Sequence, residues 1–225
     1  MRYVAFLFLA LALVATDEAL AQRTSKPVPP SVVEAVPTVE DFALAAHNDR
    51  DDLVRALLVR GMDPNTVGPD GNPVLVTAAR EGSAKVVDRL LAAGAKVDQP
   101  NSFGDTALKL ASLHGRIDIA KKLRARGAQL NPSGWTPLIY AATGGHDQMV
   151  RYLLAEGAAI DARAPNGTTA LMMAVHEEKF STAVLLIAHG ANVNLSNDSG
   201  ATALSWAERS GDRELTDRLR AAGAR

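Results

Sequence analysis

The sequence contains no cysteine, and this absence excludes several kinds of protein. A chain without cysteine forms no disulfide bond, carries no lipid attached through a cysteine, and cannot bind zinc through thiolates. The lack of cysteine is compatible with an oxidising compartment but does not by itself indicate one.

An excess of charge of either sign is also missing. The chain has 24 lysines and arginines against 25 aspartates and glutamates. Non-specific nucleic-acid binding depends on neutralising phosphates with basic side chains, so this balance argues against a nucleic-acid partner. We interpret the one basic cluster as a solvated helix face rather than an anion site; it consists of Lys121, Lys122, Arg124 and Arg126.

Long hydrophobic runs are absent as well, apart from 13 apolar residues at positions 3–15. This run follows Arg2, is shorter than the ~20 residues that span a bilayer, and is followed by Ala19-Leu20-Ala21. The pattern predicts a secretory signal peptide over residues 1–21, with an uncleaved anchor as the weaker alternative. Residues 22–37 contain four prolines and are predicted to be an extended linker. The leader favours a bacterial envelope protein, most simply a periplasmic one, over a secreted eukaryotic protein.

Known catalytic signatures are missing too. The sequence has no phosphate-binding loop, no nucleophile elbow and no helical zinc motif, and its five histidines are scattered. We therefore expect no enzymatic activity, no cofactor and no metal. An enzyme with an unrecognised site is a distant alternative.

What the sequence does contain is a repeat marked by glycines. One series opens each unit at Gly71, Gly104, Gly134, Gly167 and Gly200, in steps of 33, 30, 33 and 33 residues. A second series closes the units at Gly61, Gly94, Gly127, Gly157, Gly190 and Gly223. Between them lie two short apolar patterns with helical spacing, as in Leu138, Ala141 and Ala142. Such short helices are unstable alone, so neighbouring units must stack on them.

Two sequence steps recur in the same register. Thr-Ala-Leu or Thr-Pro-Leu recurs at Thr106, Thr136, Thr169 and Thr202, and the unit ends read GAKVD, GAQLN, GAAID and GANVN. In these features the chain resembles the ankyrin repeat family over residues 38–225. The resemblance implies an all-α repeat solenoid: an ankyrin array of about six helix-turn-helix units, terminal caps included, joined by β-hairpin loops. The expected units are 38–70, 71–103, 104–133, 134–166, 167–199 and 200–225.

The register also predicts which unit junction is weakest. Arg124 occupies a position that faces the following repeat in this family, just before the hairpin that is three residues shorter than the others. We expect its stem to be packed and its charged head to lie in solvent. The junction between units 104–133 and 134–166 is therefore predicted to be the loosest. In the last unit, Thr216 and Arg220 hold the two second-helix positions that face the following repeat and are mostly apolar in the other units. This polar face indicates that no further repeat packs on it and that the array ends there.

The resemblance implies protein binding through hairpin tips and the inner faces of the first helices, which form one concave surface. By register, the predicted partner-binding residues are Asp70, Asn72, Arg80, Glu81, Phe103, Asp105, Leu113, His114, Trp135, Thr143, Asn166, Thr168, His176, Glu177 and Arg209, flanked by Ser199, Ala201 and Ser210. Phe103, Leu113 and Trp135 are expected to form an apolar centre, since exposed aromatics are typical of binding sites. Alternatively, Trp135 folds onto its own hairpin and Phe103 covers a neighbouring tip. Tyr140 and Trp206 are assigned to the core, and His146 to structural hydrogen bonding.

The predicted function is a non-enzymatic protein–protein interaction module of the bacterial periplasm. It would either support an envelope enzyme or inhibit a toxin as an immunity protein, and the sequence does not separate these roles. The alternative is a structural tether that uses the proline-rich segment. The expected partner is another protein of unknown identity, with no nucleic acid and no membrane insertion after signal cleavage; the unbound chain is expected to be a monomer.

Overall fold

A computed structural model describes residues 36–225, so the predicted signal peptide and nearly all of the linker lie outside the described residues. Within that part all regular structure is helical, and no helix there is long and apolar enough to cross a membrane. The first helices of the units are α3 (Val39–His47), α5 (Val74–Glu81), α7 (Ala107–Leu113), α9 (Pro137–Gly144), α11 (Ala170–His176) and α13 (Ala203–Ser210). The second helices are α4 (Asp51–Val59), α6 (Ala84–Ala92), α8 (Ile117–Ala125), α10 (Asp147–Ala155), α12 (Phe180–Ala188) and α14 (Arg213–Ala221).

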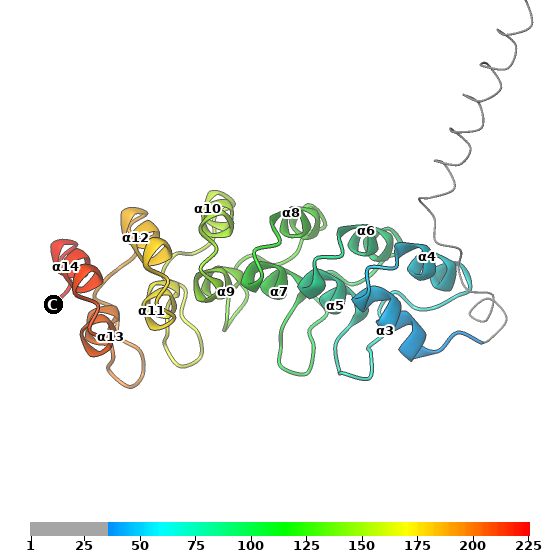
Figure 1. Cartoon of the computed structure of the whole chain (residues 1–225), viewed down its shortest axis with the longest axis horizontal. Helices are drawn as coiled ribbons and strands as arrows, with labels where there is room; N and C mark the ends of the chain where they lie inside the picture. Colours follow the sequence, from blue (N-terminus) through cyan, green and yellow to red (C-terminus); the bar gives the residue numbers. More distant parts are fainter. Residues whose placement is uncertain (1–35) are drawn as a thin grey trace, which may run out of the picture. The chain divides into compact units, whose positions relative to one another are not determined.

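The helices of residues 37–225 stack in two rows. First helices pack on first helices, second helices on second helices, and each pair packs within its own unit. Figure 1 shows these rows, with the connecting loops extending beyond the row of first helices. One continuous hydrophobic core runs between the rows, from Phe42 in α3 to Leu219 in α14. The expectation of an all-α repeat solenoid is confirmed.

The recurring threonines begin the first helices. Thr106, Thr136, Thr169 and Thr202 are the N-cap residues of α7, α9, α11 and α13, and each hydroxyl accepts a hydrogen bond from a first-turn amide at 3.1–3.5 Å. These bonds satisfy amides that have no partner inside the helix. Thr38 caps α3 in the same way and forms a capping box with Asp41.

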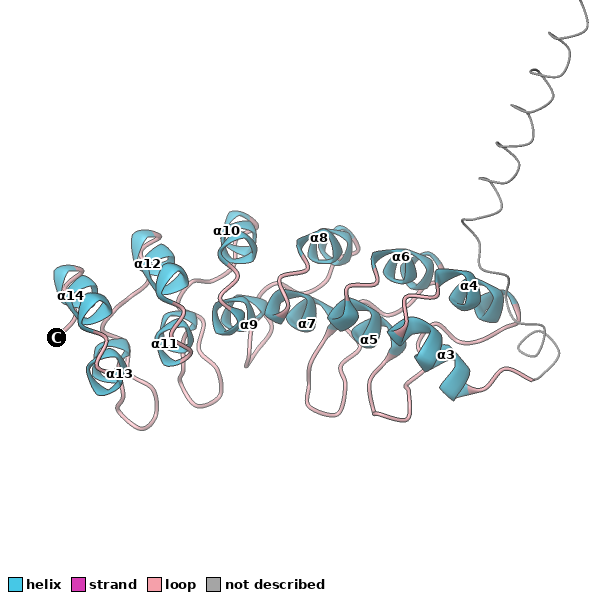
Figure 2. Cartoon of the chain, in the orientation of Figure 1, coloured by secondary structure: helices cyan, strands magenta, loops and turns pink. Residues whose placement is uncertain are grey.

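The recurring glycines form the turns. All opening and closing glycines have positive φ angles, from 76° to 93°, a conformation that costs glycine little. The four full-length hairpins end in a tight turn closed by an amide of the opening glycine, for example Gly71 N to Gly68 O at 2.9 Å. Figure 2 shows these connections as loops, and the described residues contain only isolated bridges, Val67 with Pro73 and Ser196 with Thr202.

An Asp or Asn four residues after a closing glycine connects one unit to the next, both in the GA-x-x-[DN] steps and in the first unit, where the step reads GMDPN. Its side-chain oxygen accepts a hydrogen bond from a backbone amide in the following closing turn. The pairs are Asn65 with Lys96, Asp98 with Gln129, Asn131 with Ala159, Asp161 with Asn192 and Asn194 with Arg225, at 2.8–3.0 Å. We call this series the Asx ladder. It explains why Asp and Asn, both short acceptors, share this position.

The junction around the shortened hairpin differs from the prediction that it is the loosest. The second helices α8 and α10 do pack less extensively than any other neighbouring second helices. The first helices α7 and α9, however, pack more extensively than any other pair of their row. A Cβ atom at Gly144 of α9 would overlap the carbonyl oxygen of Leu113 in α7. The shorter connection thus accompanies a close approach of first helices, and only the outer row is loose.

Arg124 also differs from its prediction. Its side chain is 24% exposed, Nε lies 3.6 Å from Oε2 of Glu156 in the next unit, and Nη1 donates to the carbonyl oxygen of Ala128. The stem is packed as expected, but the charged head is paired across the junction instead of lying in solvent. The pairing offsets the cost of partly burying a guanidinium.

The first unit exposes apolar side chains on its outer side. Val39, Leu44 and Val59 are exposed there, Val59 to 84%. Val59 is the last residue of α4 and points away from the core.

Candidate functional site

The predicted binding residues lie along the hairpin tips and the solvent side of the first helices, which we call the first-helix surface. Asp70, Phe103, His114, Asn166, His176 and Arg209 are exposed. Half-buried members are Arg80, Glu81, Asp105, Leu113, Trp135, Thr143 and Glu177. Asn72 and Thr168, by contrast, are buried, with 8% and 1% exposure. The prediction that these two are exposed was wrong.

Asn72 and Thr168 are buried because the hairpins use them internally. The Asn72 amide donates to Asp70 at 2.7 Å and accepts from the Asn101 amide of the next tip at 2.8 Å. The backbone of Thr168 forms two hydrogen bonds within its own hairpin: its carbonyl oxygen accepts from the amide of Ala164, and its amide donates to the side chain of Asn166. Both residues shape the tips rather than face a partner.

The three predicted apolar residues do not form one exposed patch. Phe103 is 84% exposed at its tip, whereas Leu113 and Trp135 are half-buried and pack against the core. The Trp135 ring meets the Tyr140 ring edge-on, with centroids 6.2 Å apart. Trp135 therefore packs against helix α9. Of the three predicted residues, only Phe103 is largely exposed to solvent.

The assignment of Tyr140 to the core was wrong. It is half-buried on the first-helix surface, and its hydroxyl donates to Oδ1 of Asp105 in the preceding unit. Burial, together with this hydrogen bond to a carboxylate, raises the pKa of the Tyr140 hydroxyl, which stays protonated. The contact ties α9 to the hairpin that precedes α7.

At the N-terminal end of the surface, the charged side chains of an ionic cluster pair with one another. Oε1 of Glu81 lies 2.8 Å from Nε of Arg80 and 3.4 Å from Nδ1 of His47, and Arg80 also lies 4.0 Å from Asp70. Burial opposes ionisation of Glu81, but its hydrogen bond to Arg80 and the nearby positive charges outweigh burial and lower its pKa. Burial lowers the pKa of nearby His114, and the positive charges of Arg116 and Arg80 act in the same direction.

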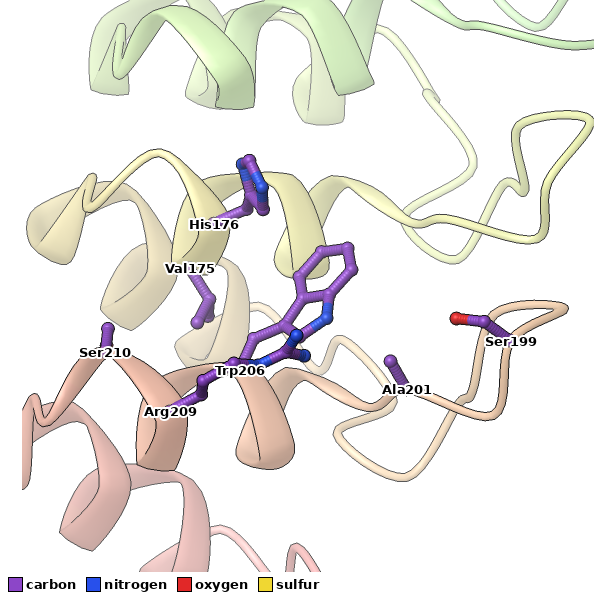
Figure 3. A pocket seen from close by; sticks show the side chains of 7 residues that line it. All are labelled: Val175, His176, Ser199, Ala201, Trp206, Arg209 and Ser210. Carbon is purple, nitrogen blue, oxygen red and sulfur yellow. The ribbon is translucent and has the colours of Figure 1, made fainter.

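At the C-terminal end of the surface, α11 and α13 border an open groove of about 460 Å³ (Figure 3). Its lining residues are Val175, His176, Ser199, Ala201, Trp206, Arg209 and Ser210. The Trp206 ring rises from α13 and meets the His176 ring at a centroid distance of 5.2 Å. The assignment of Trp206 to the core was therefore wrong, although its inner edge packs on the core. The same register in the third central unit holds Tyr140, and this shared aromatic position was the signal available in the sequence.

The histidines of the described part act separately. Nε2 of His146 lies 2.9 Å from the carbonyl oxygen of Leu113, which confirms its structural role. Within residues 36–225, no three His, Asp or Glu side chains gather as a group that could hold a metal ion. The chemistry that this surface offers is hydrogen bonding, ion pairing and aromatic contact.

Comparison with known proteins agrees with this architecture. Residues 42–133, 127–197 and 154–225 match a family model described as ankyrin repeats in three copies. A crystal structure of an ankyrin repeat domain from Acinetobacter baumannii aligns with a TM-score of 0.70 and 31% identity, covering 82% of this chain and 98% of that chain.

Two curated relatives show how widely the repeats are shared. A putative ankyrin repeat-containing protein of Treponema pallidum is 31% identical over 188 residues, 79% of this chain and 61% of that protein. The ankyrin repeat and KH domain-containing protein mask-1 of Caenorhabditis elegans is 34% identical over 149 residues, 64% of this chain but only 6% of its own length. Ankyrin repeats are protein–protein interaction modules and are in general not catalytic. From its repeats, their match to the family model and the superposition, the chain belongs to the ankyrin repeat family.

Proposed function

We propose that this chain is a non-enzymatic binding module of the bacterial periplasm that holds a protein partner against its hairpin tips and first-helix surface. The observation that most supports this proposal is the 84% exposure of Phe103 at a hairpin tip. Burial of an exposed aromatic ring by a partner stabilises the complex, and aromatic residues are frequent among binding hot spots.

Neighbouring residues support the same surface. Both tryptophans of the chain, Trp135 and Trp206, and Tyr140 lie half-buried there, so each presents part of its ring to solvent on a rigid helix or turn. Rigid aromatic groups lose little conformational entropy on binding. The surface also carries polar side chains such as Asp70 and His114, which supply the rim that protein interfaces need.

The exposed Phe103 can be tested against a matched residue. Val59 is exposed to the same 84% but lies on a second helix. In an affinity capture from envelope extract, we expect the wild-type protein and Val59→Ser to retain one specific partner that Phe103→Ser loses. Equal thermal stability of the three proteins would show that folding is unaffected. Retention of the partner by Phe103→Ser, or its loss from Val59→Ser, would contradict the proposed surface.

The periplasmic location rests on the leader. The apolar run of residues 3–15 and the small residues Ala19 and Ala21 support export and cleavage after residue 21. Protein from the periplasmic fraction is expected to begin near Gln22 on N-terminal sequencing. An intact Met1 in a membrane fraction would instead favour the uncleaved anchor.

Two physiological roles fit this module: supporting an envelope enzyme, or inhibiting a toxin as an immunity protein. Both require a rigid exported surface, and the captured partner separates them. Inhibition predicts that the chain abolishes the partner's toxic activity, and support predicts that the partner loses activity without the chain.

The alternative function is a tether, supported by the four prolines of residues 22–37. Deleting residues 22–37 would remove the localisation or the partner of a tether. It would leave capture through Phe103 unchanged if the proposed surface is correct.

A further inference from the structure

Arg80 and Arg209 occupy the same position in their units, nine residues after the opening glycine. Arg80 has two carboxylates within reach: Glu81 at 2.8 Å and Asp70 at 4.0 Å. The corresponding positions of the last unit are held by Ser210 and Ser199, which are neutral. The repeat therefore shows how an arginine at this position is satisfied, and also shows that Arg209 lacks these partners.

A histidine precedes each arginine by one unit. His47 shares Oε1 of Glu81 with Arg80, so that one carboxylate oxygen lies between a histidine and an arginine. His176 holds the register of His47 beside Arg209, but there Ser210 replaces the bridging glutamate. The C-terminal groove thus has the basic side chains of the N-terminal cluster without its central carboxylate.

The acidic residues near Arg209 are engaged elsewhere. Glu208 pairs with Arg220 of α14 at 2.8 Å, and Glu177 lies 2.9 Å from Nδ1 of His176. Arg209 is exposed and forms no hydrogen bond or ion pair within residues 36–225. Its guanidinium is available for a carboxylate from outside the chain.

The rest of the groove is suited to an apolar neighbour of that carboxylate. Trp206, Val175 and Ala201 provide an apolar wall. Ser199 and Ser210 lie at the borders, where their hydroxyls donate to Oδ1 of Asn197 and to the carbonyl oxygen of Ala207. A volume of about 460 Å³ accommodates a few side chains of an extended segment. Figure 3 shows Trp206 between the two helices, with Arg209 on the same helix.

We propose that this groove binds an aspartate or glutamate side chain of the partner protein, with its carboxylate on Arg209 and an adjacent apolar side chain on Trp206. This inference rests on the proposed function and specifies the chemistry of the partner segment. Arginine is suited to this role because its planar guanidinium forms paired hydrogen bonds with a carboxylate.

The test is selection of a random peptide library displayed on phage against the purified full chain. Peptides that bind the wild-type protein are expected to be enriched in Asp or Glu next to an apolar residue. Arg209→Gln and Ser210→Glu are expected to weaken such peptides about tenfold, the size of one charged hydrogen bond. Ser210→Glu does so by supplying the missing glutamate from within the chain, as Glu81 does for Arg80.

Matched variants test whether these losses are specific. Arg151 is an exposed arginine of α10 that also lacks a partner in the described part, and Ser181 is an exposed serine of α12. Arg151→Gln and Ser181→Glu change the net charge by the same amounts and are expected to leave affinity unchanged. Trp206→Leu is expected to remove the preference for the apolar neighbour while the acidic preference remains.

The outcomes also separate this inference from the proposed function. Selected peptides without acidic residues, or acidic peptides that bind Arg209→Gln unchanged, would overturn the carboxylate site. If those peptides still lost binding with Phe103→Ser, the first-helix surface would stand without it. Repeating the measurement with amidated peptides decides the source of the carboxylate: binding that requires a free C-terminus would overturn the assignment to a side chain.

Discussion

At the scale of single residues, the turn between the two helices of a unit shows how backbone conformation selects side chains. Gly82, Gly115, Gly145 and Gly211 hold this turn in their units, with φ between 65° and 88°. Glu178 holds it in the unit 167–199, with φ of 55°. A residue with a Cβ atom is strained in this left-handed region, so Glu178 stores a small destabilisation that the other central units avoid.

Replacing Glu178 by glycine is therefore expected to stabilise the protein, by about 1 kcal/mol in the free energy of unfolding. Urea denaturation measures this change. Glu178→Ala is the control, because it removes the same charge but keeps the Cβ atom. Equal stabilisation by both variants would assign the gain to charge and refute the backbone argument.

Glu81 gives a second expectation, which concerns pH. Its pKa in the folded chain lies below its ordinary value of 4.5, so the ionised form stabilises the fold at neutral pH. That contribution is lost as the pH falls through 4.5 toward the folded value. Because its side chain is 31% exposed, solvent screening keeps the contribution at about 0.5 kcal/mol.

Glu81→Gln should accordingly lower the melting temperature slightly at pH 7 and have no effect near pH 3. Glu178→Gln, at an exposed acid with no side-chain partner in the described part, should show no such pH-dependent difference. A constant difference across this range would mean that Glu81 acts through packing rather than through its charge.

At the scale of elements, the contact between α7 and α9 depends on one residue without a side chain. Gly144 lies where a Cβ atom would meet the backbone carbonyl of Leu113, and a backbone atom cannot move aside as a flexible side chain can. The same turn carries His146, whose ring reaches that carbonyl at 2.9 Å. The first-helix pair with the most extensive packing therefore tolerates no side chain at Gly144 without a shift of the backbone.

Gly144→Ala is expected to destabilise the protein by about 2–3 kcal/mol, despite the higher helix propensity of alanine. Thr143→Ala, at the adjacent half-buried position, should cost less than about 1 kcal/mol. Chemical denaturation of both variants measures the difference. A neutral or stabilising Gly144→Ala would show that α7 and α9 can separate without cost.

At the scale of the whole array, the Asx ladder couples each unit to the next. Asp161→Ala would leave the amide of Asn192 without its acceptor at 2.9 Å, and we expect a loss of about 1 kcal/mol with faster hydrogen exchange at that amide. Asp161→Asn should keep both the stability and the slow hydrogen exchange of the Asn192 amide. Asparagine already accepts the corresponding hydrogen bond at Asn65, Asn131 and Asn194. Equal effects of the two substitutions would indicate that charge, rather than the accepted hydrogen bond, matters there.

The sequence was sufficient for the array because its signals are local. The glycine spacing and the threonine steps each act within a few residues, and both appear in the structure as predicted. The surface was harder to predict because exposure depends on side-chain size in a repeated position. Thr77 and Leu110 are buried six residues after their opening glycines, but Tyr140 and Trp206 at that position are too long to be covered.

Pairings between units were also beyond the sequence argument. Arg124 and Glu156 lie 32 residues apart, and their contact depends on how far the second helices are separated at the shortened hairpin. Asn72 likewise is buried because the neighbouring tip supplies Asn101. These features depend on the geometry between units, which a repeat period does not specify.

The Asx ladder is unaffected by the hairpin that lost three residues. Asn131 still reaches Ala159 at 2.9 Å, although the two are 28 residues apart where the other pairs are separated by 31. The residues of the Asx ladder are therefore distinct from the residues at the tips. The length and the side chains of a tip can change during evolution while the Asx ladder stays intact. One scaffold can therefore acquire new partners without losing the hydrogen bonds that connect its units.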